Sequence, residues 1–148
     1  MIGQGMPVQI RRCGTSVLVE RLSIGDVLYD PLADNYVEIV DILSRDSTRL
    51  GDQLARIRAG QFGRDCPRQD VILSRHQPVA YPDRAHGSGP YRLEFGAAHQ
   101  LGEELRMKTN LFALFPERRG CICVGGAVLQ LNALAMSADA LAQGGGMR

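Results

Sequence analysis

The feature that most limits the possible folds is a succession of short segments in which apolar and polar side chains alternate, separated by glycine and proline. The clearest segment covers residues 36–43, YVEIVDIL, and residues 26–30, DVLYD, alternate in the same way before Pro31. A period of two places successive side chains on opposite faces of a strand, so that one face is buried and the other is solvated. The sequence therefore predicts a compact, mainly β fold of short antiparallel strands.

Further strands are predicted over residues 8–10, 16–20, 54–59, 71–73, 78–81, 111–115 and 121–131. The first two are expected to form a hairpin in which Gly14 supplies a positive φ angle. The last two are expected to pair with each other through residues 116–120, and residues 74–77 are expected to bend one strand between 71–73 and 78–81.

Helical and loop segments are few. Residues 97–105 have weak helical spacing, and residues 131–143 have clearer spacing that predicts a short C-terminal helix. Polar or turn-rich composition predicts loops over residues 45–52, 61–67 and 82–90, the last of these being the most mobile.

The length and composition fit one globular domain. A chain of 148 residues with 45% hydrophobic and 22% charged residues can bury about 70% of its unfolded surface. We expect a single domain over residues 1–143, followed by a flexible glycine-rich tail at 144–148.

The charge balance bears on the class of partner. Seventeen Lys and Arg against sixteen Asp and Glu give a net charge of +1, so no strong field attracts nucleic acid or an acidic membrane.

No apolar run approaches the roughly 20 residues that span a bilayer. The first residues also lack the basic and apolar regions of a signal peptide. We expect no nucleic-acid partner, no membrane span and no signal peptide.

The four cysteines, Cys13, Cys66, Cys121 and Cys123, are few and unevenly spaced for a disulfide scaffold, so reduced thiols are expected. His76, His86 and His99 lack the close spacing of a zinc motif, with or without Cys66. We therefore expect no metal site and no cofactor.

Four motifs resemble those of Hint domains, the self-cleaving fold of hedgehog proteins and inteins, in their bacterial hedgehog/intein-like branch. Residues 19–28, VERLSIGDVL, correspond to the family's Val-Glu-x-Leu-x-x-Gly-Asp motif and the strand after it. Residues 58–60, RAG, and 74–77, SRHQ, correspond to its Arg-Ala-Gly and Ser-x-x-His motifs, and residues 123–126, CVGG, resemble its final strand. Their order and spacing imply a Hint-like fold.

The resemblance also implies a reaction for which two residues are missing. In the family, a Cys, Ser or Thr side chain attacks the preceding backbone carbonyl, and a histidine protonates the leaving nitrogen. Counting back by the family spacing places this nucleophile near Gly3, which has no side chain. Gln77 stands where the histidine should be, and His76 is one position early, on the opposite face of a strand.

Two functional readings follow. In the first, the chain has lost self-cleavage and serves as a structural or protein-binding module with other protein subunits. The family's occurrence in secreted bacterial proteins and phage-related gene sets then suggests a secreted or virion assembly. In the second, Cys13 is the nucleophile and acts with Ser74 and His76, so that residues 1–12 are released. A third alternative is that Gly3 replaces a natural nucleophile, which would trap the precursor.

Overall fold

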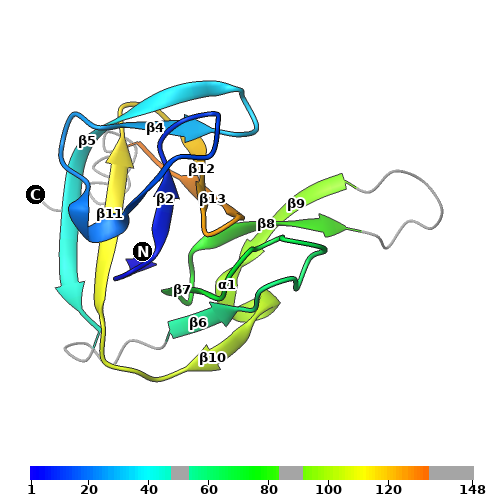
Figure 1. Ribbon diagram of the computed structural model, residues 1–148. Helices are drawn as coiled ribbons and strands as arrows, with labels where there is room; N and C mark the ends of the chain where they lie inside the picture. Colours follow the sequence, from blue (N-terminus) through cyan, green and yellow to red (C-terminus); the bar gives the residue numbers. More distant parts are fainter. Residues whose placement is uncertain (48–53, 84–91, 134–148) are drawn as a thin grey trace, which may run out of the picture.

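The computed structural model describes residues 1–47, 54–83 and 92–133. Within them, the expectation of a mainly β fold is confirmed, because the chain forms two sheets in which every recorded strand pair is antiparallel (Figure 1). The seven-stranded sheet has the order β10-β6-β7-β1-β11-β5-β4, and the six-stranded sheet has the order β3-β2-β12-β13-β8-β9.

The first sheet contains β1 (Ile2–Gly3), β4 (Val27–Asp30), β5 (Asn35–Asp46), β6 (Leu54–Ile57), β7 (Val71–Ser74), β10 (Glu103–Leu105) and β11 (Asn110–Pro116). The second contains β2 (Pro7–Gln9), β3 (Ser16–Leu18), β8 (Pro78–Asp83), β9 (Arg92–Ala97), β12 (Gly120–Val124) and β13 (Ala127–Leu131). A 3-10 turn, η1 (Val19–Arg21), and a one-turn helix, α1 (Ala98–Leu101), complete the described elements.

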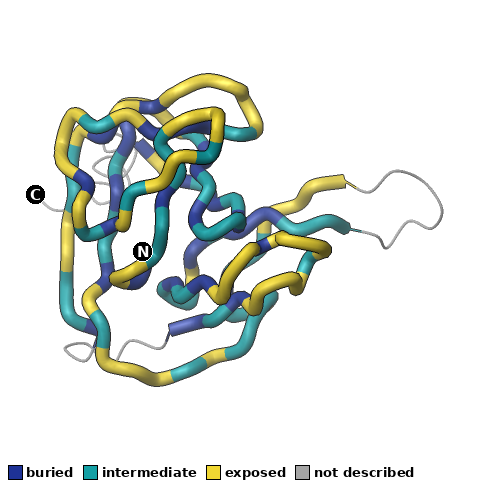
Figure 2. Tube along the Cα trace, viewed as in Figure 1, coloured by how far each residue is buried: buried dark blue, intermediate teal, exposed yellow. Residues whose placement is uncertain are grey.

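One apolar core joins the inner faces of the two sheets. In β5, Val37 and Ile39 are fully buried while Glu38 is exposed, as the alternating pattern predicts. The tube in Figure 2 shows buried residues alternating along the strands and exposed residues in the outer loops. The other large buried side chains come from both sheets and include Ile2, Val8, Leu28, Leu54, Ile57, Leu73, Leu111, Ile122 and Leu129.

The shortest strand, β1, is central to the site described below. Ile2 pairs with Leu73 of β7 on one side and with Phe112 of β11 on the other, and its side chain is 1% exposed. This two-residue strand was not predicted, because it is too short to show alternation. It fixes the first residue of the chain in the interior of the seven-stranded sheet, where Figure 1 marks the N-terminus.

The predicted hairpin of residues 8–10 and 16–20 is present as β2 and β3, with Gly14 at φ 102° in its turn. The predicted strands at 26–30, 36–43 and 54–59 are present as β4 to β6. Residues 71–73 and 78–81 were expected to form one bent strand, but they are two strands, β7 and β8, which belong to different sheets because the turn at 74–77 redirects the chain. Residues 45 and 46, predicted as loop, extend β5, since Asn110 of β11 pairs with Asp46. Cross-strand pairing thus overrides the polar composition of this segment.

Two sequence expectations in the second half are met only in part. Residues 97–105 form α1 followed by β10, because the helix ends at Gly102 and Glu103 then pairs with Arg56 of β6. Residues 121–131 form two strands, β12 and β13, joined at Gly125 and Gly126, whose φ angles are 57° and 92°. Strand β11 pairs with β1 and β5 instead of with this segment.

Several predictions fall wholly or mostly outside the described residues. They are the C-terminal helix at 131–143, the tail at 144–148 and most of the loops at 45–52 and 82–90. The described end of β13 is Leu131, and the described end of β8 is Asp83.

Candidate functional site

The site is built around the turn at residues 74–77, which connects β7 to β8. The N–H of Gln77 donates to the carbonyl of Ser74 across 3.1 Å and closes the turn. The start of α1 packs onto it, since the N–H of Ala98 donates to the Gln77 carbonyl at 3.0 Å and the N–H of His99 donates to the Arg75 carbonyl at 2.9 Å. The turn is therefore held on both sides by main-chain hydrogen bonds.

The α-amino nitrogen of Met1 is held by this turn. It donates to Ser74 Oγ across 2.7 Å and to Gln77 Oε1 across 3.0 Å. The main chain adds a third contact, because the N–H of Ser74 donates to the Met1 carbonyl at 2.9 Å. The pairing of Ile2 with Leu73 sets this register, so the short strand β1 delivers the nitrogen of residue 1 to residues 74 and 77.

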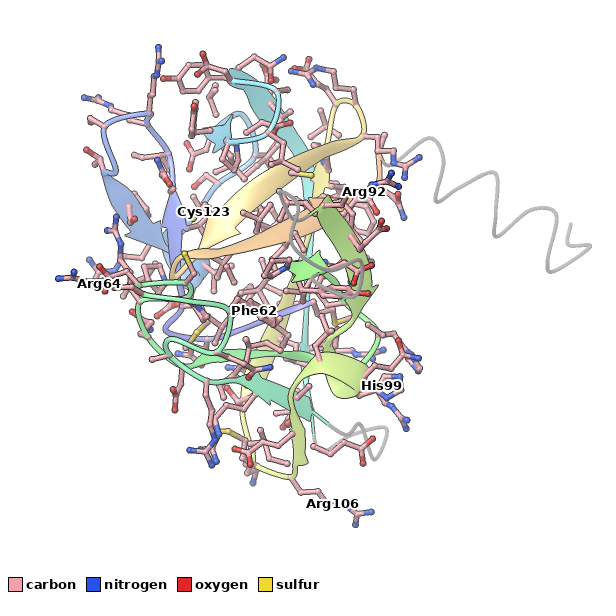
Figure 3. The ribbon with its side chains drawn as sticks, turned by 90° about the vertical axis from the view of Figure 1, so that its right-hand side faces the viewer. Phe62, Arg64, Arg92, His99, Arg106 and Cys123 are labelled. Carbon is pink, nitrogen blue, oxygen red and sulfur yellow. The ribbon has the colours of Figure 1, made fainter. Side chains whose placement is uncertain are left out.

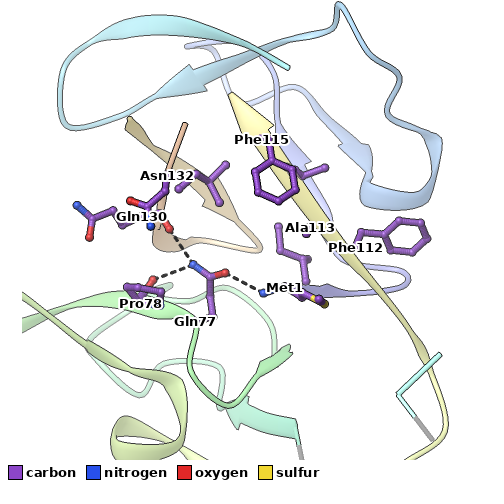
Figure 4. Close-up of a pocket in the computed structure, with 11 residues that line it drawn as sticks. Met1, Gln77, Pro78, Phe112, Ala113, Phe115, Gln130 and Asn132 are labelled. Atoms are coloured by element: carbon purple, nitrogen blue, oxygen red, sulfur yellow. Dashed lines mark hydrogen bonds between the residues drawn. The ribbon is translucent and has the colours of Figure 1, made fainter. Parts of the chain in front are cut away.

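Gln77 links the nitrogen of residue 1 to the other sheet. Its side-chain Nε2 donates to the Gln130 carbonyl at 2.9 Å and to the Pro78 carbonyl at 3.2 Å, while its Oε1 accepts from Met1 (Figure 4). Gln77 is only 7% exposed. Because both ends of the amide are bonded, its orientation is fixed, and Oε1 is the atom that faces Met1.

Burial changes the protonation of the Met1 amine. Desolvation, with a smaller contribution from the positive charge of Arg45, lowers the pKa of the amine from 8.0 to about 5. At neutral pH the nitrogen is therefore an uncharged amine that still donates hydrogen bonds to Ser74 and Gln77.

A cavity of about 160 Å³ adjoins this nitrogen between β11, β13 and the 74–77 turn. Its polar lining comes from Met1, Gln77, Gln130 and Asn132, and its apolar lining comes from Ile2, Pro78, Phe112, Ala113, Leu114, Phe115 and Leu131 (Figure 4). Sequence reasoning missed Met1, Gln130 and Asn132. Of these, only Met1 could have been inferred from the sequence, if the Ser-x-x-Gln turn had been expected to bind the nitrogen of the first residue.

The nitrogen held by the 74–77 turn is not that of Gly3, the residue that the family spacing suggests. The nitrogen that Ser74 and Gln77 contact belongs to Met1, two positions before Gly3. Gly3 instead lies inside β1, where an added Cβ would come within 3.1 Å of the Ile72 carbonyl oxygen.

The chemistry available at this nitrogen is limited. The Met1 side chain is a thioether, which has no proton to lose and is a weak acceptor. Ser74 Oγ accepts the hydrogen bond from the nitrogen, and the amide of Gln77 cannot transfer a proton at neutral pH. The arrangement positions one backbone nitrogen, but the side chain of residue 1 carries no nucleophilic group and residue 77 is not a general acid.

The structure places the three predicted catalytic residues in different surroundings. Ser74 contacts Met1, whereas His76 is exposed and packs edge-on against His99, with ring centroids 5.3 Å apart. Figure 3 shows His99 on α1 at the molecular surface. Cys13 lies in the exposed turn between β2 and β3, where its Sγ is 3.3 Å from Thr15 Oγ1.

Cys13 and His76 are separated by the order of the six-stranded sheet. Strands β12 and β13 lie between β2, which leads to Cys13, and β8, which follows His76. Three strand spacings of about 4.8 Å place β2 and β8 roughly 14 Å apart. The fold therefore places Ser74 in contact with residue 1, whereas Cys13 lies in the β2–β3 turn, away from residue 1 and His76.

The cysteines differ in environment. All four thiols are free. The pKa of the Cys13 thiol is lowered, mainly by its hydrogen bond with Thr15, with a smaller contribution from Arg11. Burial, together with the charge of Asp30, raises the pKa of Cys121 to about 11, and burial also raises that of Cys123. Cys13 combines exposure with a lowered pKa, but it lies away from the nitrogen of residue 1.

Comparison with known proteins adds no further assignment: no protein-family model matches the sequence, and no curated protein matches it.

Within the three described stretches of chain, no cluster of three or more His, Cys, Asp or Glu has the arrangement of a metal site. No described helix has the length and apolar character needed to cross a bilayer.

Proposed function

We propose that this chain is a Hint-like module that has lost self-cleavage and serves as a structural or protein-binding domain. The observation that carries the proposal is the hydrogen bonding of the Met1 nitrogen to Ser74 and Gln77 without a nucleophile at residue 1. The motifs at residues 19–28, 58–60 and 74–77 support the same proposal from the sequence.

The proposal rests on the role that each atom has in self-cleavage of this type. The side chain of the first residue attacks the carbonyl that precedes it, and the nitrogen of the first residue leaves with a proton. The leaving nitrogen corresponds to that of Met1, and the proton donor corresponds to residue 77, whose Oε1 lies 3.0 Å away. Methionine cannot attack, and glutamine cannot supply the proton.

A domain that still holds the nitrogen of residue 1 in place but lacks the groups for self-cleavage is suited to a role in recognition. Ser74, Gln77 and the 1%-exposed Ile2 fasten the start of the chain into the seven-stranded sheet. We propose that the anchored domain presents its surface to other protein subunits, in a secreted or phage-related assembly as the family resemblance suggests.

The self-cleavage part of the proposal is tested by weighing the purified chain after incubation with dithiothreitol at neutral pH. We expect the intact mass to stay unchanged, both in the unaltered chain and in Cys13→Ser. Loss of residues 1–12 from the unaltered chain but not from Cys13→Ser would assign the reaction to Cys13 and contradict the proposal.

A further inference from the structure

An open groove lies between the β2–β3 hairpin and the β4–β5 hairpin, away from the site around Met1. It encloses about 550 Å³ and is lined by Ile10, Arg11, Val17, Arg21, Asp26, Val27 and Tyr36. These residues come from two separate hairpins and from η1, so the groove exists only in the folded chain.

The lining of the groove includes two guanidinium groups, those of Arg11 and Arg21. Arg11 and Arg21 are both exposed, and neither forms an ion pair with any carboxylate among the described residues. The neighbouring Arg12 differs, because its Nε lies 3.4 Å from Asp34 Oδ1. The carboxylate in the lining, Asp26, accepts from the N–H of Ser23 at 2.8 Å through Oδ2. The lining is therefore net positive.

The apolar part of the lining is accessible. Val27 and Tyr36 are each 44% exposed, which is high for large apolar side chains on adjacent paired strands. Val17 and Ile10 pack against the core from the other hairpin. Guanidinium groups beside exposed aromatic and aliphatic surface are typical of protein-recognition surfaces.

The backbone beside the groove favours an extended ligand. Strand β3 ends the six-stranded sheet, so one of its edges pairs with no strand among the described residues. The N–H of Ile10 donates to the Thr15 carbonyl, and the N–H of Val19 donates to the Met6 carbonyl. By the alternation of an antiparallel ladder, Ser16 and Leu18 then direct their N–H and C=O groups away from β2. An extended peptide can pair with such an edge.

We infer that this groove binds an extended acidic segment of a partner protein, in which carboxylates flank an apolar side chain. The carboxylates meet Arg11 and Arg21, and the apolar side chain contacts Val27 and Tyr36. A peptide fits better than a nucleic acid, because Asp26 lines the groove and the chain carries a net charge of only +1. The inference rests on the protein-binding part of the proposed function and names the chemistry of the partner.

The test is fluorescence anisotropy at low salt with a labelled nine-residue Glu-Val peptide, Glu-Ser-Val-Ser-Glu-Ser-Val-Ser-Glu, which in an extended conformation has its Glu and Val side chains on the same face. We expect saturable binding that weakens as salt is raised and falls at least tenfold in Arg11→Ala/Arg21→Ala. The matched control is Arg64→Ala/Arg106→Ala, which removes the same charge at two exposed arginines that point outward elsewhere (Figure 3). Thermal melts of both variants check that the fold is retained.

Three results would overturn the inference: no binding of the acidic peptide, equal loss in the control variant, or tighter binding of an oligothymidylate of the same length. A Lys-Val peptide that binds as well as the Glu-Val peptide would also contradict it. None of these results changes the intact mass after thiol treatment, so failure of the groove and failure of the proposed loss of self-cleavage are distinguishable.

Discussion

The α-amino nitrogen of Met1 lies 2.7 Å from Ser74 Oγ, across 73 residues of sequence. Strand β1 contains only two residues, so this contact and the adjacent one to Gln77 help to fix the position of the first residues in the folded protein. The same contacts define which nitrogen a cleavage reaction at this turn would have to release.

Stability should depend on pH through the Met1 amine. Its pKa is about 5 when folded and 8.0 in the unfolded reference, so between these values the unfolded chain binds more protons. The free energy of unfolding should therefore rise as pH increases from about 5 to 8. The rise is at most about 4 kcal/mol, since each pKa unit corresponds to about 1.4 kcal/mol.

Urea unfolding at a series of pH values measures this dependence. A variant with one glycine added before Met1 is the control, because it replaces the titrating amine by an amide that still donates to Ser74. Its stability should change much less between pH 5 and 8. An equal rise in both proteins would assign the pH dependence to other groups.

Replacing Gln77 by leucine should lower the free energy of unfolding by about 2–3 kcal/mol. The substitution removes the hydrogen bonds to Met1, Gln130 and Pro78 and leaves buried polar groups unpaired. The same change at exposed Gln69 is the control and should cost no more than about 0.5 kcal/mol. Chemical denaturation of the two variants makes the comparison, and equal costs would rule out a special role for residue 77.

Asp30 should be among the most sensitive carboxylates in the fold. It is 3% exposed; its Oδ1 accepts from the N–H groups of Leu32 and Ala33, and its Oδ2 accepts from that of Cys121. Asp30→Ala should destabilise the protein by about 3 kcal/mol, because three donors lose a charged acceptor. Asp30→Asn should cost less, since it keeps one amide oxygen. Thermal or urea unfolding that ranks the two variants in the opposite order would refute this account.

The cysteines should react with iodoacetamide in an order that follows exposure and pKa. Cys13 should be alkylated first, because it is exposed and its pKa is lowered by its hydrogen bond with Thr15. Cys121 should react last, since burial raises its pKa to about 11. Peptide mapping by mass spectrometry gives the order. Thr15→Val should slow alkylation at Cys13 alone, and an unchanged rate would show that Thr15 does not activate the thiol.

Much of the strand pattern was predictable from local alternation, as the match of residues 36–43 to β5 illustrates. What local pattern could not give was pairing over long distances. Residues 45 and 46 have the composition of a loop, yet they belong to β5 because they pair with β11. Residues 121–131 were predicted as one strand, although Gly125 and Gly126 form a turn between two strands.

The candidate site was predictable only in part, for the same reason. Ser74 was predicted and does contact the start of the chain, and Gln77 was identified as the residue standing where the family has histidine. That residue 1 reaches this turn depends on β1, which is too short to leave an alternating pattern. The separation of Cys13 from His76 depends on sheet order, which spacing in the sequence does not encode.

The most direct test of the central claim restores the two missing groups and follows cleavage by intact mass. A small folded reporter protein is fused before residue 1 in the unaltered chain, in Met1→Cys/Gln77→His and in Gly3→Cys/Gln77→His. The last of these places the thiol where a side chain would crowd Ile72.

If residue 1 is the vacant nucleophile position, dithiothreitol should release the reporter from Met1→Cys/Gln77→His alone, at the bond before residue 1. An intact Met1→Cys/Gln77→His fusion that is nevertheless folded would contradict the claim that this turn is a self-cleavage site without its reactive groups. Release of the reporter from the unaltered fusion would contradict the claim that cleavage has been lost.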